Sequence, residues 1–157
     1  MTTTGAERIF IDTNILVYAS IAEAPLHQPA LSRLQAYEKT GQELWISRQV
    51  LREYLSVLTR PQSFTAPIPI ATISDLIHAL LDRFQVADET SQVTEQLLVL
   101  LNQTTVGGRQ VHDANIVATM QTFGIQQLLT HNVEDFSRFA GQIVVLPLLE
   151  SPSAPDR

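Results

Sequence analysis

The stretch IFIDTNILVYA, residues 9–19, decides which fold the rest of the chain must complete. Its first apolar residues predict a short buried strand over residues 8–12, which ends in the carboxylate of Asp12. Thr13 or Asn14 can cap a helix that follows directly. A strand that passes straight into a helix is typical of a parallel, helix-covered sheet, whose binding sites lie beyond the C-terminal ends of its strands. Asp12 stands at such an end.

The same alternation of strand and helix continues along the chain. Further short strands are expected over residues 43–47, 84–87, 127–130 and 143–146. Helices are expected over residues 13–20, 29–40, 48–59, 70–83, 88–102, 111–123 and 133–139. Pro25 and Pro29 are expected to bracket a loop. Strands that alternate with helices in this way predict an α/β fold built on a parallel sheet.

One domain accounts for the length and the composition. The chain has 157 residues, of which 45% are hydrophobic, and this is enough for a compact core. Because no internal repeat or boundary is visible, we expect a single domain over residues 1–150. A polar, proline-rich tail over residues 151–157 is expected to be disordered. The longest apolar run, IVVLPLL, is too short to cross a membrane and fits a buried strand.

Cysteine usage and the N-terminal residues narrow the chemistry and the compartment. There is no cysteine, which excludes disulfides, thiolate zinc sites and cysteine nucleophiles. The N-terminus has no basic region followed by a long apolar run, so no secretory signal is expected. We therefore expect a cytoplasmic protein that makes no membrane contact.

Acidic side chains recur where predicted strands end and helices begin. Asp12 follows the first strand, and Asp113 lies in a first helical turn in line with Val117, which directs it along the buried face. Glu53 sits at the edge of the apolar arc of its helix, next to Val57. Each acid has a plain structural alternative. Asp12 can cap the next helix, Asp113 can interact with the helix dipole, and a lone glutamate is more often a solvated boundary residue.

Further polar residues follow the fourth predicted strand and precede the sixth helix. Asn132 and Asp135 are candidates for the same site, and either can instead cap a short helix. Arg109, in a loop with two glycines, can touch a substrate phosphate, although a solvated surface arginine is the favoured alternative. His112 and His131 lack metal-ligand spacing to another histidine, so we assign them no catalytic role.

Together these residues predict a metal-dependent site. Carboxylates that converge at one edge of a parallel sheet cannot all stay ionised without a compensating cation. Oxygen ligands with open positions suit Mg²⁺ or Mn²⁺, which promote phosphodiester hydrolysis. The net charge of −6 counts against a general nucleic-acid binder, which usually has a basic surface. It counts less against a nuclease, because a bound metal supplies local positive charge.

The motifs, in this order, resemble those of PIN-domain ribonucleases, and particularly of the VapC-type toxins of toxin–antitoxin pairs. The segments that carry the resemblance are IFIDTNILVYA with Asp12, ISRQVLREYLSVLTRP with Glu53, VHDANIVATM with Asp113, and LLTHNVEDF. They span nearly the whole folded chain. The resemblance implies a three-layer α/β/α sandwich with a parallel sheet of about five strands. It also implies an endoribonuclease that cuts RNA with the help of Mg²⁺ or Mn²⁺.

The resemblance further assigns roles to single residues. Asp12, Asp113 and Glu53 would be the catalytic acids that hold the metal. The family often has a fourth acid where this chain has Asn132, which departs from the pattern and weakens the case for a second metal. Asn132 can still ligate through its carbonyl, or Asp135, one helical turn on, can substitute for it. The polar positions that surround the family's site are matched by Thr13, Asn14 and Thr130, and Arg109 is a candidate RNA contact.

The resemblance implies partners as well, and two rival functions stay open. The implied partners are an antitoxin, which would lay a helix or an extended segment in an apolar groove near the site, and a second copy in a homodimer. The first rival is a PIN-fold module that only binds RNA or protein, for which the amide of Asn132 is the sign. The second is a phosphoryl-transfer or receiver-like domain, which also clusters acids around Mg²⁺. The chain lacks a convincing lysine for that chemistry, and Glu53 would have no role in it.

Overall fold

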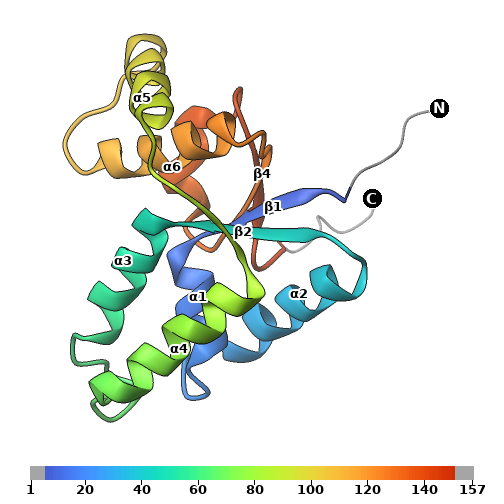
Figure 1. Cartoon of the computed structure of the whole chain (residues 1–157), viewed down its shortest axis with the longest axis vertical. Helices are drawn as coiled ribbons and strands as arrows, with labels where there is room; N and C mark the ends of the chain where they lie inside the picture. Colours follow the sequence, from blue (N-terminus) through green and yellow to red (C-terminus); the bar gives the residue numbers. More distant parts are fainter. Residues whose placement is uncertain (1–5, 151–157) are drawn as a thin grey trace, which may run out of the picture.

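The computed structural model describes residues 6–150, which form a five-stranded sheet with all strands parallel. The strand order is β3-β2-β1-β4-β5 (Figure 1). The strands are β1 (Arg8–Ile11), β2 (Glu43–Ser47), β3 (Gln85–Ala87), β4 (Gln127–Thr130) and β5 (Val144–Pro147). The predicted disordered tail, residues 151–157, lies outside the described residues.

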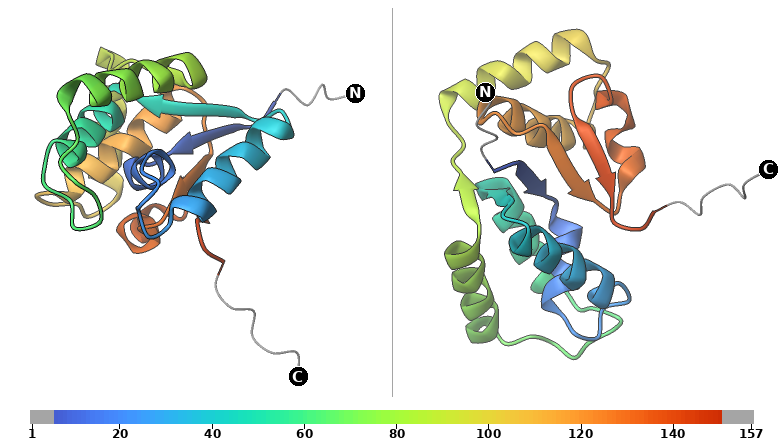
Figure 2. Two further views of the ribbon diagram at one scale, coloured as in Figure 1. Left: turned by 90° about the horizontal axis from the view of Figure 1, so that it is seen from below. Right: turned by 90° about the vertical axis from the view of Figure 1, so that its right-hand side faces the viewer.

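The helices form two layers, one on each face of the sheet (Figures 1 and 2). The first layer contains α1 (Thr13–Ser20), α2 (His27–Lys39), α3 (Arg48–Leu58) and α4 (Ile70–Arg83). The second layer contains α5 (Ser91–Gln103), α6 (Gln110–Thr122) and the short 3₁₀ helix η1 (Val133–Phe139). Connections between parallel strands are right-handed. The connecting helices therefore lie on one face of the sheet while successive strands are added in one direction, and on the other face once strands are added in the opposite direction. This arrangement confirms the predicted three-layer α/β/α sandwich with a five-stranded parallel sheet.

Strands are added on one side of β1 first and on its other side afterwards, so the switch point of the sheet lies between β1 and β4. From β1 the chain moves to β2 and β3, and from β3 it crosses back to β4 and β5. The helix that follows β1 and the helix that follows β4 therefore cover opposite faces of the sheet. Such a switch point leaves room for a ligand outside the C-terminal ends of the two strands.

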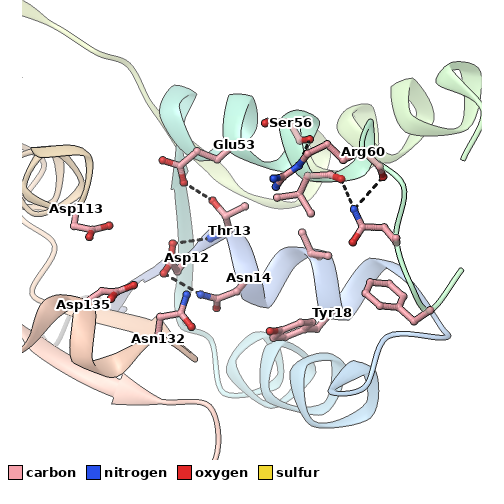
Figure 3. Close-up of a pocket in the computed structure, with 14 residues that line it drawn as sticks. Asp12, Thr13, Asn14, Tyr18, Glu53, Ser56, Arg60, Asp113, Asn132 and Asp135 are labelled. Carbon is pink, nitrogen blue, oxygen red and sulfur yellow. Dashed lines mark hydrogen bonds between the residues drawn. The ribbon is translucent and has the colours of Figure 1, made fainter. Parts of the chain in front are cut away.

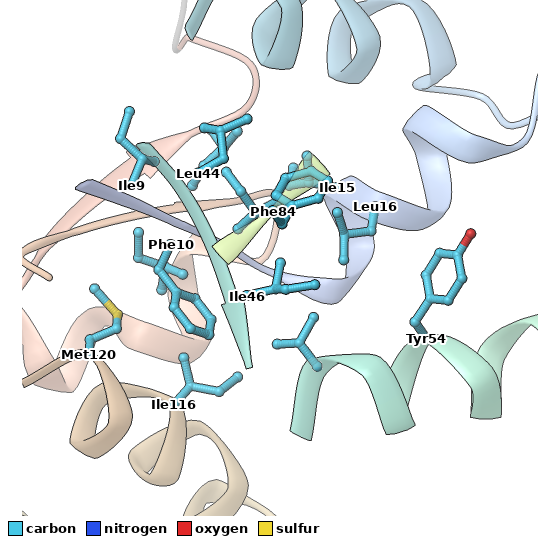
Figure 4. Close-up of a cluster of buried hydrophobic side chains, with 14 of the residues drawn as sticks. Ile9, Phe10, Ile15, Leu16, Leu44, Ile46, Tyr54, Phe84, Ile116 and Met120 are labelled. Carbon is cyan, nitrogen blue, oxygen red and sulfur yellow. The ribbon is translucent and has the colours of Figure 1, made fainter. Parts of the chain in front are cut away.

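The apolar residues of β1 fix the position of the strand end that carries Asp12. Ile9, Phe10 and Ile11 are all buried, as expected for a central parallel strand that is covered on both faces. Phe10 points toward Ile116 and Met120 of α6, in the second layer (Figure 4). Because successive side chains of a strand point to opposite faces, β1 is held by both helix layers. The carboxyl end of the strand is therefore set by the core.

Three details differ from the prediction, each for a physical reason. Helix α2 starts at His27, so Pro29 lies in its first turn, where the missing N–H has no helical partner to lose. Helix α5 starts only at Ser91, and the residues before it instead pair with arginines of α3, as Arg48 does with Asp88. The run IVVLPLL forms an edge strand rather than a fully buried one, and Val144 is 53% exposed.

Within residues 6–150, no helix combines the length and the apolar character that a bilayer span requires.

Candidate active site

A pocket with a volume of about 520 Å³ opens at the C-terminal ends of β1 and β4, at the switch point (Figure 3). Its walls come from both helix layers and from the loop that connects α3 to α4. The lining residues are Asp12, Thr13, Asn14, Val17, Tyr18, Glu53, Ser56, Val57, Arg60, Gln62, Phe64, Asp113, Asn132 and Asp135. The acidic side chains lie toward one end, and Tyr18 and Arg60 lie toward the other (Figure 3).

The pocket brings together all five predicted metal-site residues from five separate elements or connections. Asp12 follows β1, Glu53 lies in the middle of α3, and Asp113 lies in the first turn of α6. Asn132 follows β4, and Asp135 lies in η1. Asn132 stands at the start of η1 but makes no capping hydrogen bond with its side chain. Four carboxylates thus face one cavity.

The arginine that lines the pocket is not the one that the sequence offered as a candidate RNA contact. Arg109, the predicted RNA contact, stands at the start of α6, is exposed, and does not line the pocket. Arg60 does line it, at the end of α3, with its Nε donating to the carbonyl of Ser56 at 3.1 Å. The basic residue that lines the cleft therefore comes from the end of α3, beside the α3–α4 loop, whose Gln62 and Phe64 also line it.

Asp12 is held by donors from the start of α1 and from the end of β4. Its Oδ1 accepts a 2.8 Å hydrogen bond from the Thr13 amide, so it does cap α1. Its Oδ2 accepts hydrogen bonds from the hydroxyl of Thr130 at 2.7 Å and from the amide of Asn14 at 3.2 Å. Asp12 is 7% exposed. Its carboxylate therefore caps a helix and also faces the cavity, so the two alternatives seen in the sequence are both true of one side chain.

The connection after β4 is tied to α1 by the same polar residues. The amide of His131 donates to Oδ1 of Asn14 at 3.1 Å, and the amide of Asn132 donates to the hydroxyl of Thr130 at 3.0 Å. Thr130 is fully buried. Thr13, Asn14 and Thr130 thus surround the acids in space, and they set where Asn132 begins the next helix.

Glu53 is fixed through both of its carboxylate oxygens. Its Oε2 accepts a 2.8 Å hydrogen bond from the hydroxyl of Thr13, and its Oε1 accepts a 2.9 Å bond from the amide of Gln49. Gln49 also donates to the carbonyl of His112 at 2.9 Å and accepts from Asn115 at 2.7 Å. Sequence reasoning missed Gln49 and Asn115. Gln49 and Glu53 lie one helical turn apart, and this spacing could have indicated their contact. The contact with Asn115 joins helices of the two layers, and no local spacing could have indicated it.

Burial and mutual repulsion disturb the acids. The pKa of Asp113 is raised from 3.8 to about 7, first by burial and then by the charges of Asp135, Asp12 and Glu53, while Arg138 opposes the increase. The pKa of Asp12 is raised to about 6, mainly by burial and in part by the charge of Glu53, while the hydrogen bonds that it accepts oppose the increase. Two carboxylates that resist ionisation in one pocket indicate a site adapted to a cation or a proton.

The donor set fits a hard divalent cation in its chemistry. The polar atoms that face the acid end are carboxylate and amide oxygens, the ligands that Mg²⁺ and Mn²⁺ prefer. As the side chains stand, no three His, Cys, Asp or Glu residues among residues 6–150 are close enough to hold an ion. Asp12 and Glu53 are fixed by hydrogen bonds. Within the same residues, the carboxylates of Asp113 and Asp135 accept no side-chain hydrogen bond, so these two ligand candidates are free to turn.

Similar proteins place this site in a family. A family model described as the PIN domain matches residues 9–142. The chain is 27% identical over 131 residues to Ribonuclease VapC24 of Mycobacterium tuberculosis, and the match covers 82% of this chain and 89% of that protein.

Solved structures with the same fold include toxin–antitoxin complexes. VapBC2 from Rickettsia felis, bound to a promoter DNA fragment, has a TM-score of 0.65 at 18% identity and covers 89% of this chain and 98% of that one. A toxin–antitoxin complex from Klebsiella pneumoniae has a TM-score of 0.64 at 20% identity, covering 91% and 99%. VapC20 of M. tuberculosis, described as a sarcin–ricin loop cleaving toxin, has a TM-score of 0.57 at 24% identity, covering 76% and 86%. The predicted resemblance is thereby confirmed, and with most of its length matched by the family model, the chain belongs to the PIN domain family.

Proposed function

We propose that this protein is a metal-dependent endoribonuclease and the toxin of a toxin–antitoxin pair. The observation that carries the proposal is the convergence of Asp12, Glu53, Asp113 and Asp135 in one pocket at the switch point of the sheet. The similarity to a ribonuclease of the VapC group and to a toxin described as cleaving the sarcin–ricin loop supports RNA as the substrate class.

Asp12, Glu53 and Asp113 would hold Mg²⁺ or Mn²⁺, with Asn132 ligating through its carbonyl and Asp135 nearby. Bound there, the cation would lower the pKa of a water and offset charge that develops on the phosphate. Asp12 and Glu53 contribute fixed oxygens because their other lone pairs are taken up by Thr13, Thr130 and Gln49. Asp113 must lose its proton and turn toward them. This reorientation would close the ligand set that is open in the structure.

The other end of the pocket suits a segment of single-stranded RNA. Val17, Val57, Tyr18 and Phe64 provide an apolar wall with two aromatic rings, next to the guanidinium of Arg60. Unpaired bases pack on aromatic side chains, and arginine binds phosphate oxygens through charge-assisted hydrogen bonds. A base would therefore lie on the apolar wall, while the phosphate to be cut lies among the acids.

Arg60→Ala is expected to raise KM for a single-stranded RNA oligonucleotide about tenfold, since a hydrogen bond to a charged group contributes roughly 1.5–3 kcal/mol. Steady-state cleavage kinetics would measure the change. Arg109→Ala is the matched control, because Arg109 is exposed and outside the pocket, and its KM should change less than about twofold by the same reasoning. Equal effects of the two substitutions would contradict the assigned path of the RNA.

The nuclease proposal is tested by incubating total RNA with antitoxin-free protein in the presence of Mn²⁺, Mg²⁺ or EDTA. Cuts are expected with either cation and not with EDTA. Asp12→Asn should abolish them, whereas Asp75→Asn, which removes an exposed acid of α4 outside the pocket, should not. If folded wild-type protein binds RNA but cuts none of it, the rival proposal of a PIN-fold binding module replaces this one, with the amide of Asn132 as its explanation.

The partners follow from the same proposal. The toxin–antitoxin complexes with this fold support an antitoxin as the partner of this chain. The apolar groove beside the acids is the surface that a helix or an extended segment of the antitoxin would cover. We also propose a homodimer, which size-exclusion chromatography with light scattering would test.

A further inference from the structure

Gln49 is a buried amide that spans the two walls of the pocket without lining it. It lies in α3, one turn before Glu53, and is 5% exposed. Its Nε2 donates to Oε1 of Glu53 and to the carbonyl of His112, both at 2.9 Å, and its Oε1 accepts from Asn115 at 2.7 Å. Both His112 and Asn115 belong to α6, the helix that carries Asp113.

The orientation of this amide is determined by its partners. The carbonyl of His112 can only accept a hydrogen bond, so the NH₂ group of Gln49 must face it. The Nε2 then has a second hydrogen for Glu53, and its own oxygen faces the NH₂ group of Asn115. A reversed amide would set oxygen against oxygen at two of its three contacts. Gln49 therefore presents a donor to the Glu53 carboxylate at all times.

The hydrogen bonds form one continuous chain from α6 to the end of β1. Asn115 donates to Gln49, and Gln49 donates to Glu53. Thr13 donates to the other oxygen of Glu53 through its hydroxyl, and its amide donates to Asp12. The chain connects the element that carries Asp113 with the two acids whose positions are fixed. No other set of residues described in residues 6–150 links α3 to α6 by side-chain hydrogen bonds.

We propose that Gln49 is a positioning residue, which orients the Glu53 carboxylate and sets the spacing of α3 and α6 for cation binding, with Asn115 as its support. This inference rests on the proposed function. A hydrogen-bonded partner behind a metal ligand commonly changes metal affinity or activity about 10- to 100-fold when it is removed. Gln49 itself does not line the cavity, so its effect must pass through the residues that it bonds, Glu53 and those of α6.

The test compares Gln49→Leu and Asn115→Leu with Gln96→Leu. Gln96 is the matched control, because it donates to Gln121 at 2.7 Å in a part-buried amide pair between α5 and α6, away from the pocket. Mn²⁺ affinity is measured by electron paramagnetic resonance. The kcat and KM for RNA are measured by steady-state cleavage at saturating Mn²⁺. We expect Gln49→Leu to weaken Mn²⁺ binding and to lower kcat about tenfold each, with KM within about twofold. Asn115→Leu, which leaves the donor to Glu53 in place, should weaken Mn²⁺ binding about threefold. Gln96→Leu should change neither quantity.

A double variant, Gln49→Leu with Asn115→Leu, should be no weaker in Mn²⁺ binding than Gln49→Leu alone, because the two residues act in one chain. Wild-type Mn²⁺ affinity in Gln49→Leu, or an equal loss in Gln96→Leu, overturns the proposal. If Gln49→Leu fails to fold, the Asn115→Leu variant is the test, and an unchanged Mn²⁺ affinity in that variant overturns the proposal. A wild-type protein that binds Mn²⁺ but leaves RNA intact refutes the nuclease, while the ratio of Mn²⁺ affinities still tests the positioning role.

Discussion

Asp113→Asn is expected to abolish RNA cleavage and, at the same time, to make the metal-free protein more stable. A loss of activity of about a thousandfold corresponds to roughly 4 kcal/mol of transition-state stabilisation. The stability gain follows because burial and three nearby carboxylates raise the pKa of Asp113 to about 7, so its charge is unfavourable at neutral pH. A neutral amide of the same shape removes that repulsion. For a partly buried side chain, screened by solvent, the gain is about 1 kcal/mol, or roughly 2–4 °C in Tm.

Initial rates on RNA with Mn²⁺ and thermal unfolding in EDTA measure the two effects. Asp75→Asn serves again as the control, because it removes an exposed charge without touching the pocket and should change neither. A variant that loses activity but gains stability identifies Asp113 as an acid that is needed for function and that destabilises the metal-free fold. A variant that loses both activity and stability would assign Asp113 to the architecture of α6 instead.

The stabilising effect of Mn²⁺ is expected to grow with pH. In the folded protein Asp12 and Asp113 have pKa values of about 6 and about 7, against an ordinary value of 3.8. The folded state therefore holds protons that the unfolded state has lost, and the contribution of both groups to stability falls as the pH rises from 3.8 to about 7. A cation competes with those protons for the same oxygens, so it binds more weakly at low pH.

Thermal unfolding with EDTA and with millimolar Mn²⁺, at about pH 5 and about pH 8, is the measurement, since ligand binding to the native state raises Tm by mass action. We expect the rise in Tm caused by Mn²⁺ to be several-fold larger at the higher pH. The double variant Asp12→Asn, Asp113→Asn should respond little to Mn²⁺ at either pH. An equal response of the wild type at both values would show that the cation binds elsewhere.

Much of the fold could be predicted from local sequence, because residues at the ends of the helices and strands mark where each element begins or stops. In the structure Asp12, the alternative to Thr13 and Asn14, caps the helix directly after β1. Ser47 caps the helix directly after β2 in the same way. The acids could be predicted as one site because parallel strands present their carboxyl ends at a common edge. The edge position of Val144 could not be predicted, since an apolar run looks the same in a central strand and in an edge strand.

The residues that escaped prediction are those whose partners are set only by tertiary packing. Arg60 ends a helix and Arg109 begins one, and nothing local decides which of the two lies over the cleft. In the sequence, Gln49 looks like an ordinary polar residue of α3. Its role is visible only from its contacts with α6 in the folded protein. Asn115 lies 66 positions from Gln49, and this contact has no periodicity to reveal it.

The switch-point position of the pocket has a consequence for the synthesis of this protein. Its acids are encoded from near the start of the chain to beyond residue 130, and they meet only after β4 has paired with β1. A ribosome that has translated the first three strands holds a chain with Asp12 and Glu53 but without Asp113. A premature stop at any point before that codon would yield a polypeptide that lacks a complete site. A chain that stops before Asp113 would thus lack the proposed activity.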